Sequence, residues 1–234
     1  MNLGFRLQTI ADFVISDKVF ADIGTDHAYL PIYLVKSGIV KQAIAGDYNK
    51  GPYEAAKKAV ENYNLTDNID VRLGNGLAVL NEGEADTVAI AGMGGSTIVE
   101  ILSADIKLTQ QIHRFILQPM NNSQGLRQWL NQNYFKIVAE ELVIDEGKLY
   151  EVIVVERGTE TINEEILYEI GPKLWEQKHC LLEEHLNKLI VKARNIYNSL
   201  GQSDRADVTD KINLYEAKIK DLEDKLQCLL NAKS

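Results

Sequence analysis

The sequence predicts an α/β fold in which a mostly parallel, seven-stranded sheet is followed by an α-helical hairpin of coiled-coil type. Short, nearly all-apolar runs alternate with helical patterns through residues 19–157, as is typical of a parallel sheet covered by helices on both faces. The last two runs meet through a polar turn at residues 145–148, so we expect an antiparallel strand at the end of the sheet. A heptad pattern then fills the remaining chain. We therefore divide the sequence into a domain of residues 1–158 and a helical hairpin of residues 159–234.

Each predicted strand is a short apolar run that ends at a polar residue or a glycine. The strands are expected at residues 19–23, 42–46, 69–73, 86–91, 115–117, 135–144 and 149–157. Apolar residues spaced by three and four predict a helix before the first strand and one after each of several strands. These helices are expected at residues 3–14, 31–36, 50–63, 96–102 and 124–131.

The heptad spacing of the tail runs from Trp175 to Leu200 and resumes from Val208 to Leu229 after a polar break. This pattern predicts two antiparallel helices, the second of them capped by Ser203 or Asp204. Two ordinary helices packed on the first domain are the alternative. Heptads can also pair between chains, so we expect a monomer or a weak dimer.

Composition narrows the class of protein. The formal net charge is −9, which argues against nucleic-acid binding over the whole surface but leaves room for a local basic patch. The two cysteines, Cys180 and Cys228, have no zinc-ligand spacing and form no disulfide framework, so we expect no metal site. No apolar run approaches the ~20 residues of a membrane span, and no signal peptide is visible. We therefore expect a cytoplasmic protein with no membrane contact.

Polar residues gather where the first strand ends. Asp22 lies near that end, and Gly24 permits a close backbone approach before the turn Thr25–Asp26–His27 begins. Ligands of open parallel sheets bind beyond the carboxyl ends of the strands, near the switch in strand order. The N–H groups at the start of the following helix would also favour a polar or anionic ligand. This turn is therefore the predicted centre of a ligand site, although each residue alone could be a turn former or a helix cap.

Asp47 narrows the type of ligand, because an acid at the end of the second strand can accept hydrogen bonds from two ribose hydroxyls. A dinucleotide fingerprint with three spaced glycines is absent, and Asp26 would repel a phosphate. These observations favour S-adenosylmethionine over a dinucleotide, with Asn75 at the adenine edge. Gly92, Gly94 and Gly95 exclude side chains from the turn after the fourth strand, where a ligand could approach closely.

Three motifs and the heptad tail together resemble the TrmK family of bacterial tRNA methyltransferases, which modify N1 of adenine 22. The motifs are ADIGTDHAYLP, AIAGMGG and QPMNN. The resemblance implies a class I (Rossmann-like) methyltransferase domain, S-adenosylmethionine as cofactor and tRNA as partner. It implies that the cofactor cleft is lined by Gly24, Thr25, Asp26, His27, Asp47, Asn75, Gly76, Gly92, Met93, Gly94 and Gly95.

The chemistry of the target base indicates what the acceptor side needs. N1 of adenine already carries a lone pair, so orientation and tolerance of positive charge matter more than a strong base. Asp22, Asp26 and His27 are the catalytic candidates, since an acceptor near the exocyclic amine would help; His27 could equally cap or pack the turn. Both parts of the chain are net acidic, so tRNA binding should depend on local cations. The candidates are Arg6, Lys50, Lys57, Lys58, Arg127, Lys188, Lys192 and Arg194.

Two other functions fit parts of the pattern. One is a methyltransferase that acts on another RNA, a protein or a small molecule, which would not need an extended helical arm. The other is a noncatalytic RNA-binding or assembly protein whose heptads pair between chains.

Overall fold

The structure is a computed structural model that describes residues 3–201 and 209–232. The chain forms two compact units, Met1–Thr161 and Ile162–Ser234. The division falls three residues after the boundary expected from the sequence at residue 158. The expected capping residues Ser203 and Asp204 lie outside the described residues.

The first unit is built on a seven-stranded sheet with the order β3-β2-β1-β4-β5-β7-β6. Its strands are β1 (Phe20–Ile23), β2 (Ala43–Asp47), β3 (Ile69–Leu73), β4 (Thr87–Met93), β5 (Arg114–Pro119), β6 (Phe135–Asp145) and β7 (Lys148–Arg157). All pairs from β3 to β5 are parallel, whereas β7 is antiparallel to both of its neighbours. The predicted mostly parallel α/β sheet is confirmed.

The position of the antiparallel strand differs from the prediction. We expected it at the end of the sheet, but β7 lies between β5 and β6, and β6 forms the edge. The reason is visible in burial: Val152, Ile153, Val154 and Val155 are buried in succession, as an inner strand requires. β6 alternates between buried and more exposed residues, which suits an edge.

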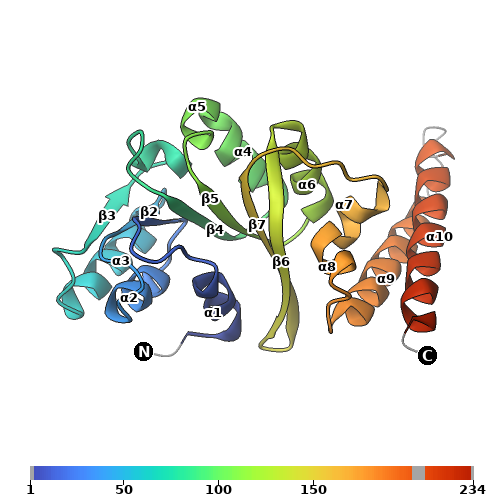
Figure 1. The fold of residues 1–234 in the computed structure, drawn as a ribbon, viewed down its shortest axis with the longest axis horizontal. Helices are drawn as coiled ribbons and strands as arrows, with labels where there is room; N and C mark the ends of the chain where they lie inside the picture. Colours follow the sequence, from blue (N-terminus) through green and yellow to red (C-terminus); the bar gives the residue numbers. More distant parts are fainter. Residues whose placement is uncertain (1–2, 202–208, 233–234) are drawn as a thin grey trace. The chain divides into compact units, whose positions relative to one another are not determined.

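Helices cover both faces of the sheet, as Figure 1 shows. One face packs against α1 (Phe5–Asp12), α2 (Tyr29–Lys36) and α3 (Lys50–Asn62), and the other against α4 (Gly95–Ala104) and α6 (Ser123–Gln132). Two short elements, η1 (Gly76–Val79) and α5 (Ile106–Thr109), were not predicted. Each face has its own apolar core, so the strands are held from both sides.

The alternation of side chains along a strand decides which polar groups face α1. Phe20 on β1 and Ile116 on β5 belong to the core beneath α1 and α2. Asp22 and Gln118 follow two residues later on the same strands and therefore point to the same face. Between them runs β4, whose Ala89 is the register partner of both Asp22 and Ile116. A short side chain on the middle strand leaves the space above it to α1.

The second unit is helical. It contains α7 (Ile166–Ile170), α8 (Pro172–Glu176), α9 (Leu182–Gly201) and α10 (Thr209–Asn231). The start of the first predicted tail helix was wrong, because Trp175 lies on α8 and the helical conformation is interrupted before α9 begins at Leu182. Lys178 has a φ of 49°, outside the helical region, and the His179 ring accepts the N–H of Leu181.

Helices α9 and α10 pack along each other (Figure 1), and Arg194 pairs with Glu223 at 2.6 Å across them. Leu186, Leu189, Leu222 and Leu229 are buried along this hairpin. Among the helices that the structure describes, none has the length and apolar character needed to cross a bilayer.

Candidate functional site

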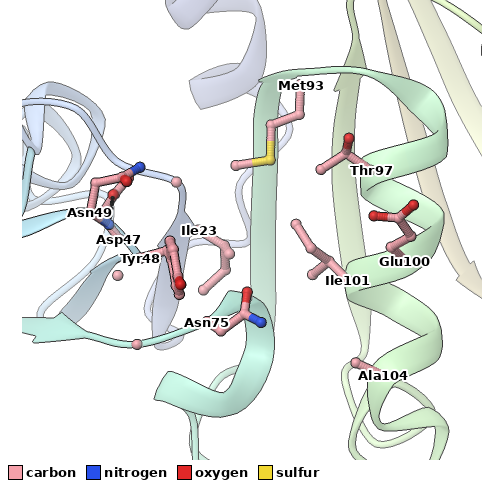
Figure 2. Close-up of a pocket in the computed structure, with 14 residues that line it drawn as sticks. Ile23, Asp47, Tyr48, Asn49, Asn75, Met93, Thr97, Glu100, Ile101 and Ala104 are labelled. Carbon is pink, nitrogen blue, oxygen red and sulfur yellow. Dashed lines mark hydrogen bonds between the residues drawn. The ribbon is translucent and has the colours of Figure 1, made fainter.

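A cleft of about 310 Å³ opens at the carboxyl ends of the first four strands. It lies where the sequence placed a ligand, because β1, β2, β3 and β4 end at one edge of the parallel sheet. Figure 2 shows the β2 end on one side and helix α4 on the other. The lining residues are Ile23, Gly24, Gly46, Asp47, Tyr48, Asn49, Gly74, Asn75, Gly76, Met93, Thr97, Glu100, Ile101 and Ala104.

Backbone forms the floor of this cleft because glycines occupy it. Gly24 has a φ of +81°, and a Cβ there would lie 2.0 Å from the Met93 methyl carbon. The N–H groups of Gly24 and Thr25 both donate to the carbonyl of Gly46, at 2.8 and 3.1 Å. Any side chain at Gly24 would have to displace Met93 from the cleft.

Asp47 is the acid of this cleft. It ends β2, is 8% exposed, and its Oδ1 accepts the N–H of Asn49 at 2.6 Å. This bond fixes the carboxylate at the cleft wall, where it can accept further hydrogen bonds from a ligand. Asn75 follows β3 and lines the cleft. Its side chain makes no capping hydrogen bond to η1.

A bulge in β4 directs Met93 into the cleft. The pairing of β4 with β5 shifts between Ala91 and Met93, and the intervening Gly92 has a φ of +74°. Such a bulge re-aims the side chain that follows it. In Figure 2 the Met93 thioether reaches across the cleft toward Ile23. Met93 therefore narrows the space above Gly24.

Of the predicted cofactor residues, the structure brings Gly24, Asp47, Asn75, Gly76 and Met93 together in the cleft. The remaining six, Thr25, Asp26, His27, Gly92, Gly94 and Gly95, are not among its lining residues.

Gly94 and Gly95 have a packing role. The Gly95 N–H donates to the Asn121 carbonyl at 2.9 Å, and a Cβ at Gly95 would lie 2.4 Å from the Asn122 carbonyl oxygen. The two glycines therefore let the turn before α4 pack against the segment that follows β5.

Thr25, Asp26 and His27 form the turn between β1 and α2. The Thr25 hydroxyl accepts the N–H of Ala28 at 3.1 Å, which makes it a turn residue. Asp26 and His27 are solvent-accessible, with side chains 78% and 43% exposed and 3.6 Å apart at their nearest polar atoms. The His27 ring stacks on Tyr29 with 5.1 Å between ring centroids.

A second polar group lies beneath α1, and we call it the Asp22 cluster: Asp22, Arg6 and Gln118. Burial raises the pKa of Asp22 to about 6. The Thr25 hydroxyl and the Arg6 charge lower this pKa in part, whereas the Asp47 charge raises it further. Arg6 donates through Nη1 to Gln118 Oε1 at 2.9 Å, and its guanidinium lies 5.6 Å from the centroid of the Tyr150 ring. Buried carboxyl groups whose pKa lies near neutral pH are found preferentially at functional sites.

Arg127 was predicted to bind RNA, and this prediction is wrong. Its side chain is 0% exposed and donates to Glu140 and Glu151, each at 2.7 Å. A guanidinium buried between two carboxylates cannot reach a phosphate. We call these three residues the Arg127 cluster. The cations Lys50, Lys57, Lys58, Lys188 and Lys192 are exposed, whereas Arg194, also exposed, is paired with Glu223.

Sequence reasoning missed the wall that α4 supplies. Thr97, Glu100, Ile101 and Ala104 line the cleft at helical spacings of three and four, so they share one face of α4. That spacing was visible in the sequence, but nothing indicated which face would meet the cleft. In the part of the chain that the structure describes, no group of three or more histidine, cysteine, aspartate or glutamate side chains could hold a metal ion.

Comparison with known proteins adds an independent finding. The model of the TrmK family, tRNA (adenine(22)-N(1))-methyltransferase, matches residues 20–224. The tRNA (adenine(22)-N(1))-methyltransferase of Bacillus subtilis (strain 168) is 36% identical over 238 residues, covering 98% of this chain and 96% of that protein.

Solved structures agree. A Streptococcus pneumoniae protein in complex with S-adenosyl-L-methionine is 35% identical, with a TM-score of 0.85 and coverage of 96% of this chain and 100% of that one. The M. capricolum TrmK in complex with S-adenosyl-homocysteine is 32% identical, with a TM-score of 0.83 and coverage of 97% and 99%.

Proposed function

This chain belongs to the TrmK family of tRNA (adenine(22)-N(1))-methyltransferases, and we propose that it works through the cleft and the Asp22 cluster described above. The chain is an S-adenosylmethionine-dependent enzyme that methylates N1 of adenine 22 in tRNA. The family, activity and cofactor predicted from the sequence are confirmed. The proposal concerns which residues perform the reaction.

The residues of the cleft fit S-adenosylmethionine. Cβ atoms at Gly46 and Gly74 would each lie 2.7 Å from Val79, so the wall behind the cleft must be bare backbone. Asp47 presents a buried carboxylate suited to two ribose hydroxyls, and Asn75 offers an amide to the adenine edge. When bound there, S-adenosylmethionine supplies an electrophilic methyl group.

The Asp22 cluster would face the adenine that receives the methyl group. Asp22 would accept a hydrogen bond from the exocyclic amine, orienting N1 and compensating the positive charge that methylation places on the base. The pKa of about 6 leaves Asp22 mostly ionised at pH 7 and above, which this role needs. The exposed His27–Tyr29 stack at the neighbouring turn offers an aromatic surface for a base turned out of the tRNA.

The tRNA itself would be held by exposed cations in both units, among them Lys50, Lys188 and Lys192. Each part of the chain is net acidic, so we expect recognition by shape with a few phosphate contacts. The enzyme would act in the cytoplasm as a monomer or a weak dimer. Sedimentation of the full chain over a hundredfold range of concentration checks the oligomeric state: we expect a monomer at the lowest concentration, and a dimer at every concentration would contradict this.

The observation that carries the proposal is the cleft with Asp47 buried at its wall. The test incubates the purified protein with methyl-labelled S-adenosylmethionine and unmodified tRNA, followed by nucleoside analysis. We expect 1-methyladenosine from tRNA with adenine at position 22 and none from tRNA carrying guanine there. Label in protein, or in the guanine-22 tRNA, would contradict the assignment.

Asp47→Ala tests the cleft separately. Because a hydrogen bond to a charged group contributes about 1.5–3 kcal/mol, we expect S-adenosylmethionine affinity to fall by about 10- to 100-fold. Calorimetric titration measures this, with Asp67→Ala, an exposed aspartate of the same unit, as the matched control. Wild-type affinity in a folded Asp47→Ala protein would remove Asp47 from the site.

A further inference from the structure

Gln118 is a polar side chain at the end of an apolar strand, and it is 0% exposed. Its Oε1 accepts two hydrogen bonds, from Arg6 Nη1 at 2.9 Å and from the Gly92 N–H at 3.1 Å. Its Nε2 donates to the Pro119 carbonyl at 3.1 Å and lies 3.6 Å from the Met120 sulfur. Turning the amide over would place Nε2 against two donors, so its orientation is fixed.

The bond to Gly92 connects Gln118 with the cofactor cleft. Gly92 is the residue at which the β4–β5 register shifts, and its N–H is directed to Gln118 Oε1. The bulge in turn directs Met93 over Gly24. Without an acceptor at Gln118, the Gly92 N–H would lose its hydrogen bond, and the bulge would be held only from its far side, where the Met120 N–H donates to the Met93 carbonyl at 2.7 Å.

The bond to Arg6 connects the same oxygen with the acceptor side. Arg6 lies on α1, whose N-terminus is held by Asp145: the Phe5 N–H donates to Asp145 Oδ1 at 3.2 Å. The Arg6 guanidinium also makes a cation–π contact with the Tyr150 ring. The charges that act on Asp22 are Arg6 from α1 and Asp47 from β2, with the Thr25 hydroxyl as a hydrogen-bond donor. Of the Arg6 and Asp47 charges, Arg6 is therefore the one that favours the ionised form of Asp22.

We propose that Gln118 is a positioning residue that couples the two halves of the active site, because one buried oxygen holds the Arg6 guanidinium on the sheet face that carries Asp22 and also fixes the Gly92 bulge that directs Met93 into the cofactor cleft. The inference rests on the proposed function, since its main readout is methylation of adenine 22. It assigns Arg6, which the sequence suggested as an RNA-binding residue, to the tuning of Asp22.

The test compares Gln118→Met, Arg6→Met and the double variant. Rates of tRNA methylation are measured from pH 5 to 9 under single-turnover conditions with saturating S-adenosylmethionine. Each single variant should lose about tenfold in rate, the scale of one charge-assisted hydrogen bond. Each should also shift the acid limb of the pH profile to higher pH, because the Arg6 charge that favours ionised Asp22 is removed in Arg6→Met and is no longer held in place in Gln118→Met. The double variant should be no slower than the slower single variant, within about twofold, because both changes break one contact.

Cofactor affinity distinguishes the two contacts of Gln118, the one to Arg6 and the one to Gly92. S-adenosylmethionine affinity should fall by about three- to tenfold in Gln118→Met and stay at the wild-type value in Arg6→Met, because only Gln118 holds the Gly92 bulge. Gln132→Met, the same substitution at an exposed glutamine of α6, is the matched control and should change neither measurement.

Independent, multiplicative losses in the double variant, or an acid limb that Gln118→Met leaves unmoved, would overturn the coupling. If Gln118→Met does not fold, Gln118→Asn keeps the amide but is one methylene too short to hold both partners, and the same outcomes apply to it. A wild-type enzyme that binds S-adenosylmethionine yet leaves tRNA unmethylated would instead contradict the proposed function, before any variant is compared.

Discussion

The first unit contains two groups of arginine and carboxylate side chains, and they differ in how completely their charges are paired. In the Arg127 cluster the guanidinium donates to Glu140 and Glu151, each at 2.7 Å. Burial alone would lower the pKa of Arg127, but the two carboxylates outweigh it and the pKa is raised. In the Asp22 cluster the Arg6 hydrogen bond goes to the neutral Gln118, and the pKa of Asp22 rises to about 6.

The difference separates a structural group from a reactive one. A fully paired buried cluster gains nothing from a ligand, and its removal leaves uncompensated charge in the core. A carboxylate whose burial is only partly compensated can gain from a donor that a substrate brings. Residue types alone do not distinguish the two, which is why the sequence suggested the same RNA-binding role for both Arg6 and Arg127.

The largest expected effect is on stability and comes from Arg127→Met. Removing one partner of a buried ion pair costs about 3–5 kcal/mol, here because Glu140 would remain buried without its cation. Urea denaturation measures the loss, and Lys148→Met, at an exposed cation of β7, should change stability by less than about 0.5 kcal/mol. If Arg127→Met keeps its stability but loses tRNA affinity, the two clusters are not different in kind.

The pH dependence of stability should reveal the incomplete pairing of Asp22. Its pKa is raised from 3.8 to about 6, so the folded state holds this proton to higher pH than the unfolded state does. The contribution to the free energy of unfolding is therefore fully present below about pH 4 and is lost as pH rises through about 6. Between these limits wild type should lose up to about 3 kcal/mol relative to Asp22→Asn. Denaturation of both proteins at pH 4 to 7 checks this, and a constant difference would contradict it.

Activity should change in the opposite sense at the same residue. Asp22→Asn removes a charged acceptor from the target amine, so we expect methylation to slow by about 100-fold, while stability at pH 8 is unchanged or improved. The control is Asp67→Asn, an exposed aspartate, with wild-type rate. A folded Asp22→Asn enzyme with full activity would place Asp22 with Arg127 as a structural residue.

The smallest effects are expected at exposed cations, which unlike Arg127 can reach a phosphate. Lys188→Ala and Lys192→Ala should each weaken tRNA binding about two- to fivefold at low salt. Each should also reduce the slope of log affinity against log salt concentration by ~1, the effect of one lost phosphate contact. Filter binding at several salt concentrations measures both quantities. Asn187→Ala, at an exposed neutral neighbour, should leave them unchanged. Equal losses for all three variants would indicate disturbed packing of α9 rather than lost phosphate contacts.

Prediction from sequence succeeded where the signal is local. The apolar runs identified all seven strands, and their ends identified Asp47 and Asn75, because parallel strands bring their carboxyl ends to one edge. Contacts between distant segments were not predictable. Arg6 and Gln118 are 112 residues apart, and Arg127 of α6 depends on partners in the later strands β6 and β7. The break between α8 and α9 was also missed, because apolar spacing continues across a segment whose backbone is not helical.

The anchoring of α1 by the β6–β7 hairpin has a consequence for the order in which the enzyme is assembled. Every residue that lines the cofactor cleft lies between Ile23 and Ala104, so these residues leave the ribosome early. Phe5 is held by Asp145, which is synthesised 140 residues later. The start of the chain must therefore wait, without its anchor, until the hairpin is made. A nascent chain can thus carry every lining residue of the cofactor cleft before it carries Gln118, which fixes the Met93 bulge, and before it carries the anchor of α1.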